Sequence, residues 1–211
     1  LHVRSRRQRQ MCIRDRYMPP KWSQGTIYYQ IFPERFRKEN PFYAPENCVA
    51  WGSKPTAFNF MGGNLNGIRK SLSYLAELGV ECIYLNPVFA SPSNHKYDTT
   101  DYYKVDPHFG SNEDLRILVK EAHEKHIRVI LDAVFNHTGT EFFAFADLLK
   151  NQEKSEYQSW YHITCFPVRE EADCYECFFG FAGMPKLNTG NEKVQEYFLN
   201  VLELSLIHIS E

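Results

Sequence analysis

The alternation of apolar runs and amphipathic stretches along the chain predicts three buried strands separated by helices. Residues 129–131, Val-Ile-Leu, form an unbroken apolar run, so we predict a strand over residues 129–134 that is buried on both faces, as in a parallel sheet covered by helices. A similar run at residues 80–85 predicts a second strand. The aromatic and β-branched segment 25–33, which a proline terminates, predicts a third.

Three other segments carry the apolar period of helices. Residues 68–78 repeat apolar side chains at every third or fourth position and stop before a glycine. Residues 113–125 follow Ser111, a favourable N-cap, with Asp114 three positions later in a near capping box. Residues 191–203 show the same apolar period and predict the third helix. Because strands and helices alternate, we expect parallel strands joined by right-handed crossovers, the arrangement of α/β folds.

Residues 138–187 interrupt this alternation with an irregular aromatic segment. It is too long for an ordinary loop, so we expect a small inserted domain after the third strand, followed by a helix within residues 188–203. Its aromatic side chains suit either the core of that domain or stacking on sugar rings. The aromatic residues are Phe142, Phe143, Phe145, Trp160, Tyr161, Phe166, Phe178, Phe179 and Phe181.

The three strand and helix pairs are fewer than the eight of a closed barrel, which typically needs about 250 residues. We therefore expect a partial (β/α)8 TIM barrel, with strands one to three and two helices in residues 17–137. Residues 11–16 and 204–211 resemble translated sequencing-adapter segments, and we expect residues 1–16 and 204–211 to be disordered. The alternative for residues 1–16 is a genuine basic arm; they lack the apolar part of a signal peptide.

Composition excludes several classes of protein. The chain has 211 residues, of which 43% are hydrophobic, enough for one sizeable core. A net charge of −2 gives no sign of a nucleic-acid partner, and no apolar run approaches the length of a membrane span. Cys174 and Cys177 have a metal-like spacing, but no second pair accompanies them, so we expect loop thiols rather than a zinc or redox site. Free thiols favour a cytoplasmic location.

Polar residues follow the strand at 129–131. Asp132, Asn136 and His137 lie at or just beyond its carboxyl end, where α/β sheets and barrels build their sites. An aspartate at a strand end can simply cap the next element. Three such residues within six positions favour a functional site.

Several motifs together resemble the α-amylase family of glycoside hydrolases, in particular the neopullulanase, cyclomaltodextrinase and maltogenic amylase group. The resemblance covers residues 22–203 and implies retaining hydrolysis of α-1,4 and α-1,6 glucans such as cyclodextrin, pullulan and maltooligosaccharides. The motifs are Gly79-Val-Glu-Cys-Ile-Tyr-Leu-Asn-Pro87, His95-Lys-Tyr97 with Asp101-Tyr102, Asp132-Ala-Val-Phe-Asn-His137, and Met184-Pro-Lys-Leu-Asn188.

The resemblance implies roles for individual residues. Tyr97 would stack on the sugar ring to the left of the scissile bond, because an aromatic face suits the flat C–H surface of a sugar. His137 would donate a hydrogen bond to the primary hydroxyl of that sugar, and His95 would lie near the same subsite. Asp132 would orient an arginine of strand four. Asn136 would brace its loop or, in calcium-dependent relatives, bind the metal. Two further residues of the matched motifs have supporting roles, namely Asp101 and Asn188.

The chemistry of the family requires two carboxylates about 5 Å apart, one as nucleophile and one as acid/base. The resemblance puts them on strands four and five, beyond the end of this chain, so we expect no catalytic residue here and an inactive fragment. We also expect this chain to lack the family's β-sandwich domain ahead of the barrel, because residues 17–24 lead directly into the first predicted strand. Two alternatives stay open: a non-catalytic amylase-like binding or scaffold protein, and a transglycosylase or isomerase of the family. The expected partner is an α-glucan or cyclodextrin, and a homodimeric parent stays open.

A calcium loop of relatives in this group is altered. They use a loop of the form Asn-Gly-Asp-Pro-x-Asn-Asp and a later Gly-Gly-Asp, whereas this chain has Lys38-Glu-Asn-Pro-Phe-Tyr-Ala44 and Gly62-Gly-Asn64. No matched position keeps a carboxylate, and calcium draws its affinity largely from carboxylates. We therefore expect no cofactor, with the Lys38 ammonium holding the Asn40 and Asn64 oxygens in place of the cation. A loose loop, or a weak site rebuilt by two nearby glutamates, is the alternative.

Overall fold

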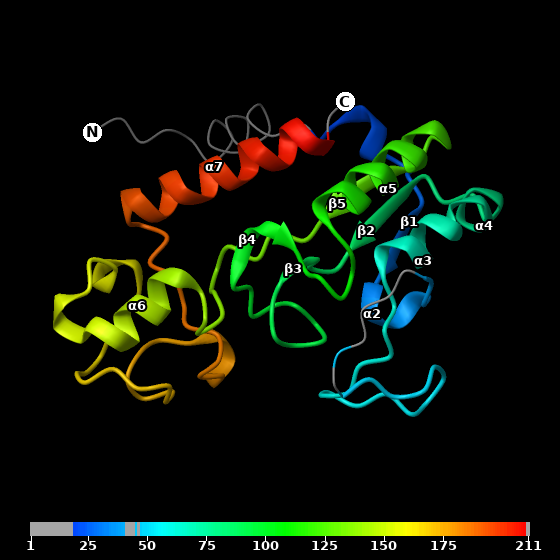
Figure 1. Ribbon diagram of the computed structural model, residues 1–211. Coiled ribbons are helices and arrows are strands. Elements are labelled where there is room, and N and C mark those ends of the chain that lie inside the picture. The colour runs from blue at the N-terminus through cyan, green and yellow to red at the C-terminus, as the bar shows by residue number, and fades with distance from the viewer. Residues whose placement is uncertain (1–18, 41–44, 46, 210–211) are drawn as a thin grey trace, which may run out of the picture.

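The computed structural model describes residues 19–40, 45 and 47–209 of the chain (Figure 1). The predicted disordered segment 1–16 lies outside the described residues. Within the described part, no helix is both long enough and apolar enough to cross a membrane.

A parallel sheet of three strands forms the centre of the fold. Its strands are β1 (Tyr28–Ile31), β2 (Cys82–Leu85) and β5 (Arg128–Leu131), in the order β1-β2-β5. The register pairs the last residue of each strand with the last residue of its neighbour, so the three carboxyl ends lie level at one edge. The three predicted parallel strands are therefore confirmed, each shorter than predicted.

The outer strand β5 is less buried than predicted. In β2, three of four residues are buried, whereas Val129, Ile130 and Leu131 of β5 are only partly covered. Within the described residues β5 pairs with β2 alone, so one side of it lacks a neighbouring strand. Residues 132–134 have already left the sheet. The prediction was therefore wrong on two points: the strand ends at Leu131 rather than at residue 134, and its residues are only partly buried.

Two short helices replace the single helix predicted at 68–78. They are α3 (Leu65–Lys70) and α4 (Leu72–Glu77), separated by Ser71. The Ser71 hydroxyl donates a hydrogen bond of 3.0 Å to the carbonyl of Gly67. Such local side-chain bonds compete with regular helix, which accounts for the interruption.

The helix α5 (Asn112–Glu124) matches its prediction closely. Ser111 accepts from the backbone N–H of Asp114 at 3.2 Å, and the Asp114 carboxylate accepts from the Ser111 N–H at 2.8 Å. This is a complete capping box. The first core lies between α3, α4, α5 and the sheet, and its fully buried members include Ile31, Leu65, Ile68, Leu72, Leu75, Ile83, Leu85 and Leu118.

An antiparallel pair between β2 and α5 was not predicted. Phe89–Ala90 (β3) pairs with Asp101–Val105 (β4). Tyr102, within β4, is 2% exposed and joins the second core of the molecule. Short elements complete the chain: η1 (Lys21–Ser23), α2 (Pro33–Phe36), η2 (Gln152–Lys154), η3 (Gln158–Trp160) and η4 (Phe178–Gly180).

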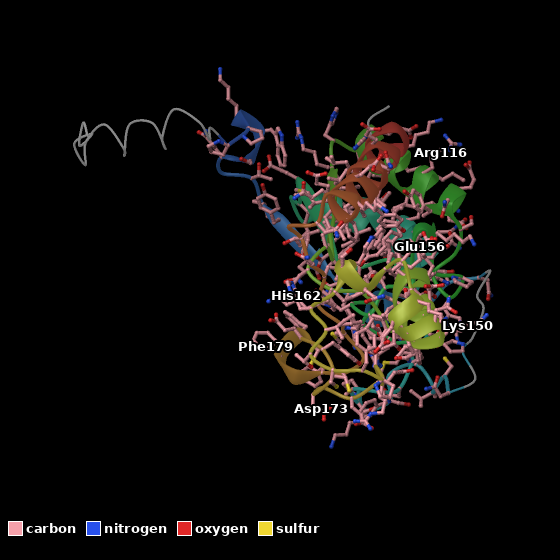
Figure 2. The ribbon with its side chains drawn as sticks, turned by 90° about the vertical axis from the view of Figure 1, so that its left-hand side faces the viewer. Arg116, Lys150, Glu156, His162, Asp173 and Phe179 are labelled. Atoms are coloured by element: carbon pink, nitrogen blue, oxygen red, sulfur yellow. The ribbon has the colours of Figure 1, made fainter. Side chains whose placement is uncertain are left out.

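The segment 138–187 contains α6 (Phe143–Asn151) and lies to one side of the sheet (Figure 1). Five of its aromatic residues are buried in the second core, namely Phe142, Phe145, Trp160, Tyr161 and Tyr175. Four others are exposed, namely Phe143, Phe166, Phe179 and Phe181; Phe179, 84% exposed, is labelled in Figure 2. The second core also takes residues from β4 and from α7, so the inserted segment shares its core with the elements that flank it.

The last helix, α7, runs from Glu192 to Ile209, beyond the predicted end at Glu203. The backbone of residues 204–209 is therefore helical, which corrects the expectation of a disordered tail there. Residues 192–209 contain no glycine or proline that would stop a helix.

Candidate functional site

A chain of hydrogen bonds crosses the carboxyl edge of the sheet. Gln30 of β1 donates to the Asn86 Oδ1 at 2.9 Å, and Asn86, directly after β2, donates to the Tyr97 hydroxyl at 3.3 Å. The Tyr97 hydroxyl donates in turn to Asp132 Oδ2, directly after β5, at 2.9 Å. All three strand ends thus contribute to one polar cluster, and Tyr97 is its central member.

The phenol of Tyr97 remains protonated at neutral pH. Burial raises its pKa to about 12, and the hydrogen bond to Asp132 and the charge of that carboxylate act in the same direction. Burial, and next the neighbouring Asp132, raise the pKa of Tyr84 in β2. The hydrogen bond from the Tyr97 phenol therefore holds the Asp132 carboxylate beside the ends of the strands.

Lys96, which stands between His95 and Tyr97 in the sequence, is buried and shapes the loop at residues 95–97. Lys96 has a φ of 62°, and its ammonium lies 2.8 Å from Asp106 Oδ2 and donates to the Ser91 carbonyl at 2.9 Å. Burial lowers the pKa of Lys96, which the Asp106 charge opposes. Because Lys96 turns inward, the rings of His95 and Tyr97 remain half-buried, with centroids 5.9 Å apart.

His137 is 3% exposed and packs face to face on Phe178, with ring centroids 4.6 Å apart and an angle of 25°. The Asn136 Nδ2 lies 3.2 Å from His137 Nδ1. An amide nitrogen can only donate, so Nδ1 accepts and the proton of the neutral ring is on Nε2. Burial lowers the pKa of His137, which favours this neutral form.

The Nε2 of His137 is buried and has no hydrogen-bond partner among the described residues. Buried polar atoms normally have a partner, so this atom calls for one from outside the described chain. Two contacts fix the backbone of His137. The Tyr102 hydroxyl donates to the His137 carbonyl at 3.0 Å, and His137 pairs with Lys186 in an isolated antiparallel bridge. The site therefore presents a fixed N–H donor beside Tyr97, whose backbone acts on the His137 ring.

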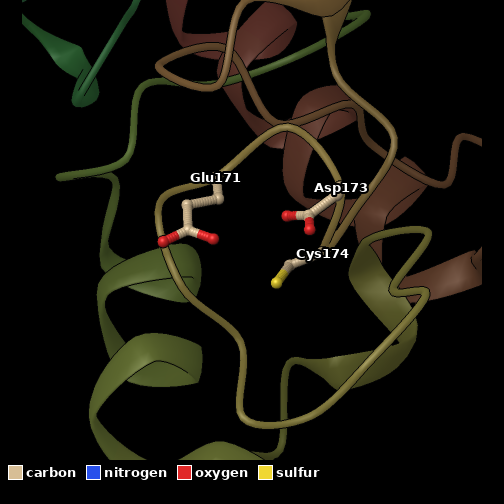
Figure 3. A group of neighbouring side chains, drawn as sticks. All are labelled: Glu171, Asp173 and Cys174. Atoms are coloured by element: carbon tan, nitrogen blue, oxygen red, sulfur yellow. The ribbon is translucent and has the colours of Figure 1, made fainter.

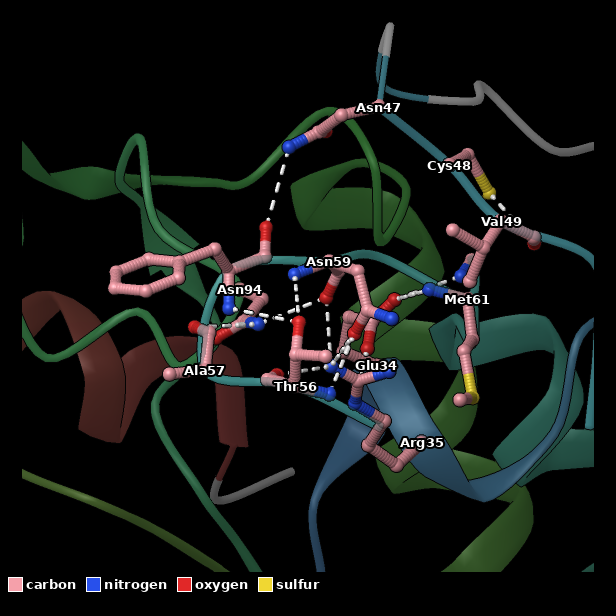
Figure 4. Close-up of polar contacts among 12 residues, drawn as sticks. Glu34, Arg35, Asn47, Cys48, Val49, Thr56, Ala57, Asn59, Met61 and Asn94 are labelled. Atoms are coloured by element: carbon pink, nitrogen blue, oxygen red, sulfur yellow. Dashed lines mark hydrogen bonds and ion pairs between the residues drawn. The ribbon is translucent and has the colours of Figure 1, made fainter. Parts of the chain in front are cut away.

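A second polar cluster braces the loop that precedes His95 (Figure 4). Glu34, 1% exposed, accepts from the Gly62 N–H at 2.7 Å, and burial raises its pKa. Arg35 donates to Asn59 Oδ1 at 2.9 Å, and Asn94 donates to the Asn59 carbonyl at 2.8 Å. These contacts fasten the long loop before α3 to α2 and to the residue next to His95.

Two predicted supporting residues act elsewhere. Asp101 accepts from the Tyr103 N–H at 2.9 Å and pairs with Lys104 at 3.3 Å, which shapes the start of β4. Asn188 donates to the Ser159 carbonyl at 3.1 Å and so braces the turn before α7. In the described part of the chain, the hydrogen bonds and the ion pair of these two residues stabilise the local backbone, and none of them joins the polar cluster around Tyr97.

Sequence reasoning missed four members of the site: Gln30, Tyr84, Asn86 and Phe178. Asn86 follows β2 as Asp132 follows β5, so the rule on strand ends would have found it. Gln30 and Tyr84 lie inside strands, and only the register reveals that they face the same cluster. Phe178 is one of many aromatics in the inserted segment, and its sequence context does not distinguish it.

In the described part of the altered loop after β1, two residues are engaged in other contacts. Asn64 Oδ1 accepts from the Gly67 N–H at 2.8 Å as the N-cap of α3, and the Glu39 carboxylate pairs with Arg37 at 2.6 Å. Residues 41–44 and Glu46 lie outside the described residues. The proposed role of Lys38 with Asn40 and Asn64 stays a prediction.

Comparison with known proteins agrees with this geometry. The family model for the alpha amylase catalytic domain matches residues 30–208. The chain belongs to the α-amylase family. The fold of this family explains why the polar cluster lies at the carboxyl ends of parallel strands.

The chain is similar to named members of the α-amylase family. It is 52% identical to a cyclomaltodextrinase of Geobacillus thermopakistaniensis over 189 residues, which cover 89% of this chain and 32% of that protein. It is 48% identical to an intracellular maltogenic amylase of Bacillus subtilis, again over 89% of this chain and 32% of the relative. The chain thus spans about a third of the length of these relatives.

A solved structure shows the same fold. The cyclic α-maltosyl-(1→6)-maltose hydrolase of Arthrobacter globiformis, in complex with cyclic α-maltosyl-(1→6)-maltose, superposes with a TM-score of 0.87 at 38% identity. The match covers 91% of this chain and 44% of that protein.

Proposed function

We propose that the protein containing this segment is a retaining glycoside hydrolase that acts on α-glucans such as cyclodextrin, pullulan and maltooligosaccharides. The observation that carries the proposal is the buried, unpartnered Nε2 of His137 at the strand edge where Tyr97 and Asp132 are hydrogen-bonded. A donor and an aromatic ring held in this way suit a sugar, which offers hydroxyls at its rim and C–H groups on its face. The named relatives, which include a cyclomaltodextrinase and a maltogenic amylase, support the same substrate class.

Each residue has a defined part in the proposal. The Tyr97 ring stacks on the sugar to the left of the scissile bond, and the His137 Nε2–H donates to a hydroxyl of the same sugar. His95 lies beside that subsite. Asp132, already hydrogen-bonded by the Tyr97 phenol, orients an arginine contributed by a later strand. Asn136 holds the tautomer of His137 through its amide nitrogen.

The bond-breaking chemistry falls to residues outside this chain. A retaining mechanism needs a nucleophile and an acid/base about 5 Å apart, and the family resemblance assigns both to later strands. We therefore propose that the 211-residue chain alone is inactive. A cytoplasmic location is part of the proposal and is supported by the relative named as intracellular. A homodimeric assembly stays a prediction.

Proton NMR of the first product tests the proposed function. A longer protein that contains this segment is mixed with cyclodextrin, and the anomeric signals are followed from the first seconds. The α-anomer is expected first, because two displacements retain the configuration. A β-anomer first would contradict the retaining mechanism. Binding of cyclodextrin without any turnover would favour a binding protein, and transfer products in place of hydrolysis would favour a transglycosylase.

A further inference from the structure

Two cysteines of the inserted segment lie against each other. The Sγ atoms of Cys165 and Cys174 are 3.0 Å apart. Local backbone pairing produces this proximity: the Thr164 N–H donates to the Cys174 carbonyl at 2.9 Å, and Ile163 bridges Tyr175 in antiparallel fashion. The side chain of Cys165 is exposed and that of Cys174 is buried.

We propose that Cys165 and Cys174 form a reversible disulfide when the protein meets a small-molecule disulfide such as oxidised glutathione. A disulfide has a sulfur–sulfur distance of about 2.05 Å, so the two side chains need to approach by only about 1 Å. The sequence spacing drew attention to Cys174 and Cys177 instead. In the fold, the backbone of Cys177 forms an isolated antiparallel β-bridge with Pro185. The thiol next to Cys174 is that of Cys165.

The exchange proceeds in two balanced steps. The exposed Cys165, as thiolate, attacks one sulfur of the small disulfide and releases one thiol. Cys174, as thiolate, then attacks the Cys165 Sγ and releases the second thiol. The protein loses two hydrogen atoms and the small disulfide is reduced to two thiols. The hydrogen bond with Cys174 raises the pKa of Cys165, so the first step becomes faster as the pH rises.

A metal site in the same place fits the geometry less well. Ligand atoms of Glu171, Asp173 and Cys174 lie within 4.8 Å of one another (Figure 3). However, two thiolates bound to tetrahedral zinc at about 2.3 Å would hold their sulfurs about 3.8 Å apart, farther than the 3.0 Å seen here. The guanidinium of Arg169 lies 3.1 Å from the Glu171 carboxylate and 3.9 Å from the Cys174 Sγ, and its charge disfavours a cation.

Peptide mapping of the 211-residue chain tests the proposal without any activity assay. The chain is incubated with oxidised glutathione, free thiols are alkylated, and trypsin cleaves after Arg169, between the two cysteines. We expect peptides 155–169 and 170–186 to be joined, and dithiothreitol to separate them. Because residues 170–186 hold both Cys174 and Cys177, the Cys177→Ser variant identifies the sulfur: the link is expected to persist. In the Cys165→Ser variant, a change at an exposed side chain, it is expected to disappear.

A parallel incubation in urea shows whether the fold directs the pairing. We expect the 165–174 link to dominate in buffer and to become one of several pairings among the six cysteines in urea. The proposal is overturned if no link forms in buffer, if the Cys177→Ser variant loses it, or if the yield of the link is the same in urea. Zinc that protects both thiols from alkylation only while Glu171 and Asp173 are present would replace the disulfide with a metal site. The result does not depend on the proposed glucan hydrolysis, so the two proposals can fail separately.

Discussion

The imidazole of His137 receives its chemical character from two neighbours and from its burial. Phe178 covers one face, Asn136 fixes the proton on Nε2, and burial lowers the pKa. In a protonated ring Nδ1 would also carry a proton, which would point at the Asn136 amide nitrogen, a group that can only donate. The same ring is therefore a donor of defined direction and a group whose protonation opposes folding.

Stability is expected to fall as the medium becomes acidic. The pKa of His137 in the folded chain lies below its ordinary value of 6.5, so the unfolded chain binds more protons between the two values. The free energy of unfolding should therefore decrease as the pH falls below about 6.5. His95 and His108 shift in the same direction, mainly through burial. Urea midpoints between pH 5 and pH 8 measure the slope.

The His137→Gln variant should have a smaller slope, although a slope remains from the other two histidines. The matched control is His123→Gln, at an exposed position of α5, whose slope should equal that of the parent chain. An unchanged slope in His137→Gln would show that this ring is not held neutral by the fold.

At the scale of elements, α3 makes a close contact with the segment after α2. This contact sets the position of the long loop before α3. A Cβ on Gly67 would lie 2.0 Å from the Arg37 carbonyl oxygen. Alanine is the better helix former by about 1 kcal/mol, so propensity alone predicts that Gly67→Ala stabilises the chain. We expect the clash to win, with a net loss of about 1–3 kcal/mol as in other overpacked sites.

Urea unfolding followed by circular dichroism measures the effect. The control is Gly183→Ala, where an added Cβ would have no neighbour within 4 Å, and its midpoint should stay close to that of the parent. Equal midpoints for the two variants would mean that α3 can move away from Arg37 at little cost.

Local patterns were enough to predict some elements and not others. The α5 helix carries its own start signal in Ser111 and Asp114, so its bounds were predictable to within a residue. The β3 and β4 pair depends on contacts with the inserted segment, such as that of Tyr102 with Phe142, which local periodicity does not contain. The candidate site divides in the same way: Asp132 and His137 follow a recognisable strand, whereas Gln30 joins them only through the register of the sheet.

At the scale of the whole molecule, the described sheet has two open edges. Within the described residues, β1 and β5 each have one neighbouring strand, and Ile27 and Tyr28 beside the β1 edge are 55% and 46% exposed. Unpaired edges with apolar side chains promote association between copies. We expect the 211-residue chain to self-associate with rising concentration in sedimentation velocity runs. The Ile27→Lys variant should do so less, and equal association of both would exclude the β1 edge as its cause.

Kinetics of Tyr97 variants in a longer protein that contains this segment test the central claim most directly, namely that the polar cluster at the strand ends binds the α-glucan. The measured quantity is kcat/KM for cyclodextrin. Tyr97→Ala should lower it about 100-fold, which corresponds to about 2.7 kcal/mol, because the stacking ring is lost. Tyr97→Phe keeps the ring but loses the hydrogen bond to Asp132, and should lower it about tenfold. Tyr74→Ala, at an exposed position of α4, should stay within about twofold of the parent. A Tyr97→Ala variant that is folded and as active as Tyr74→Ala would contradict the account.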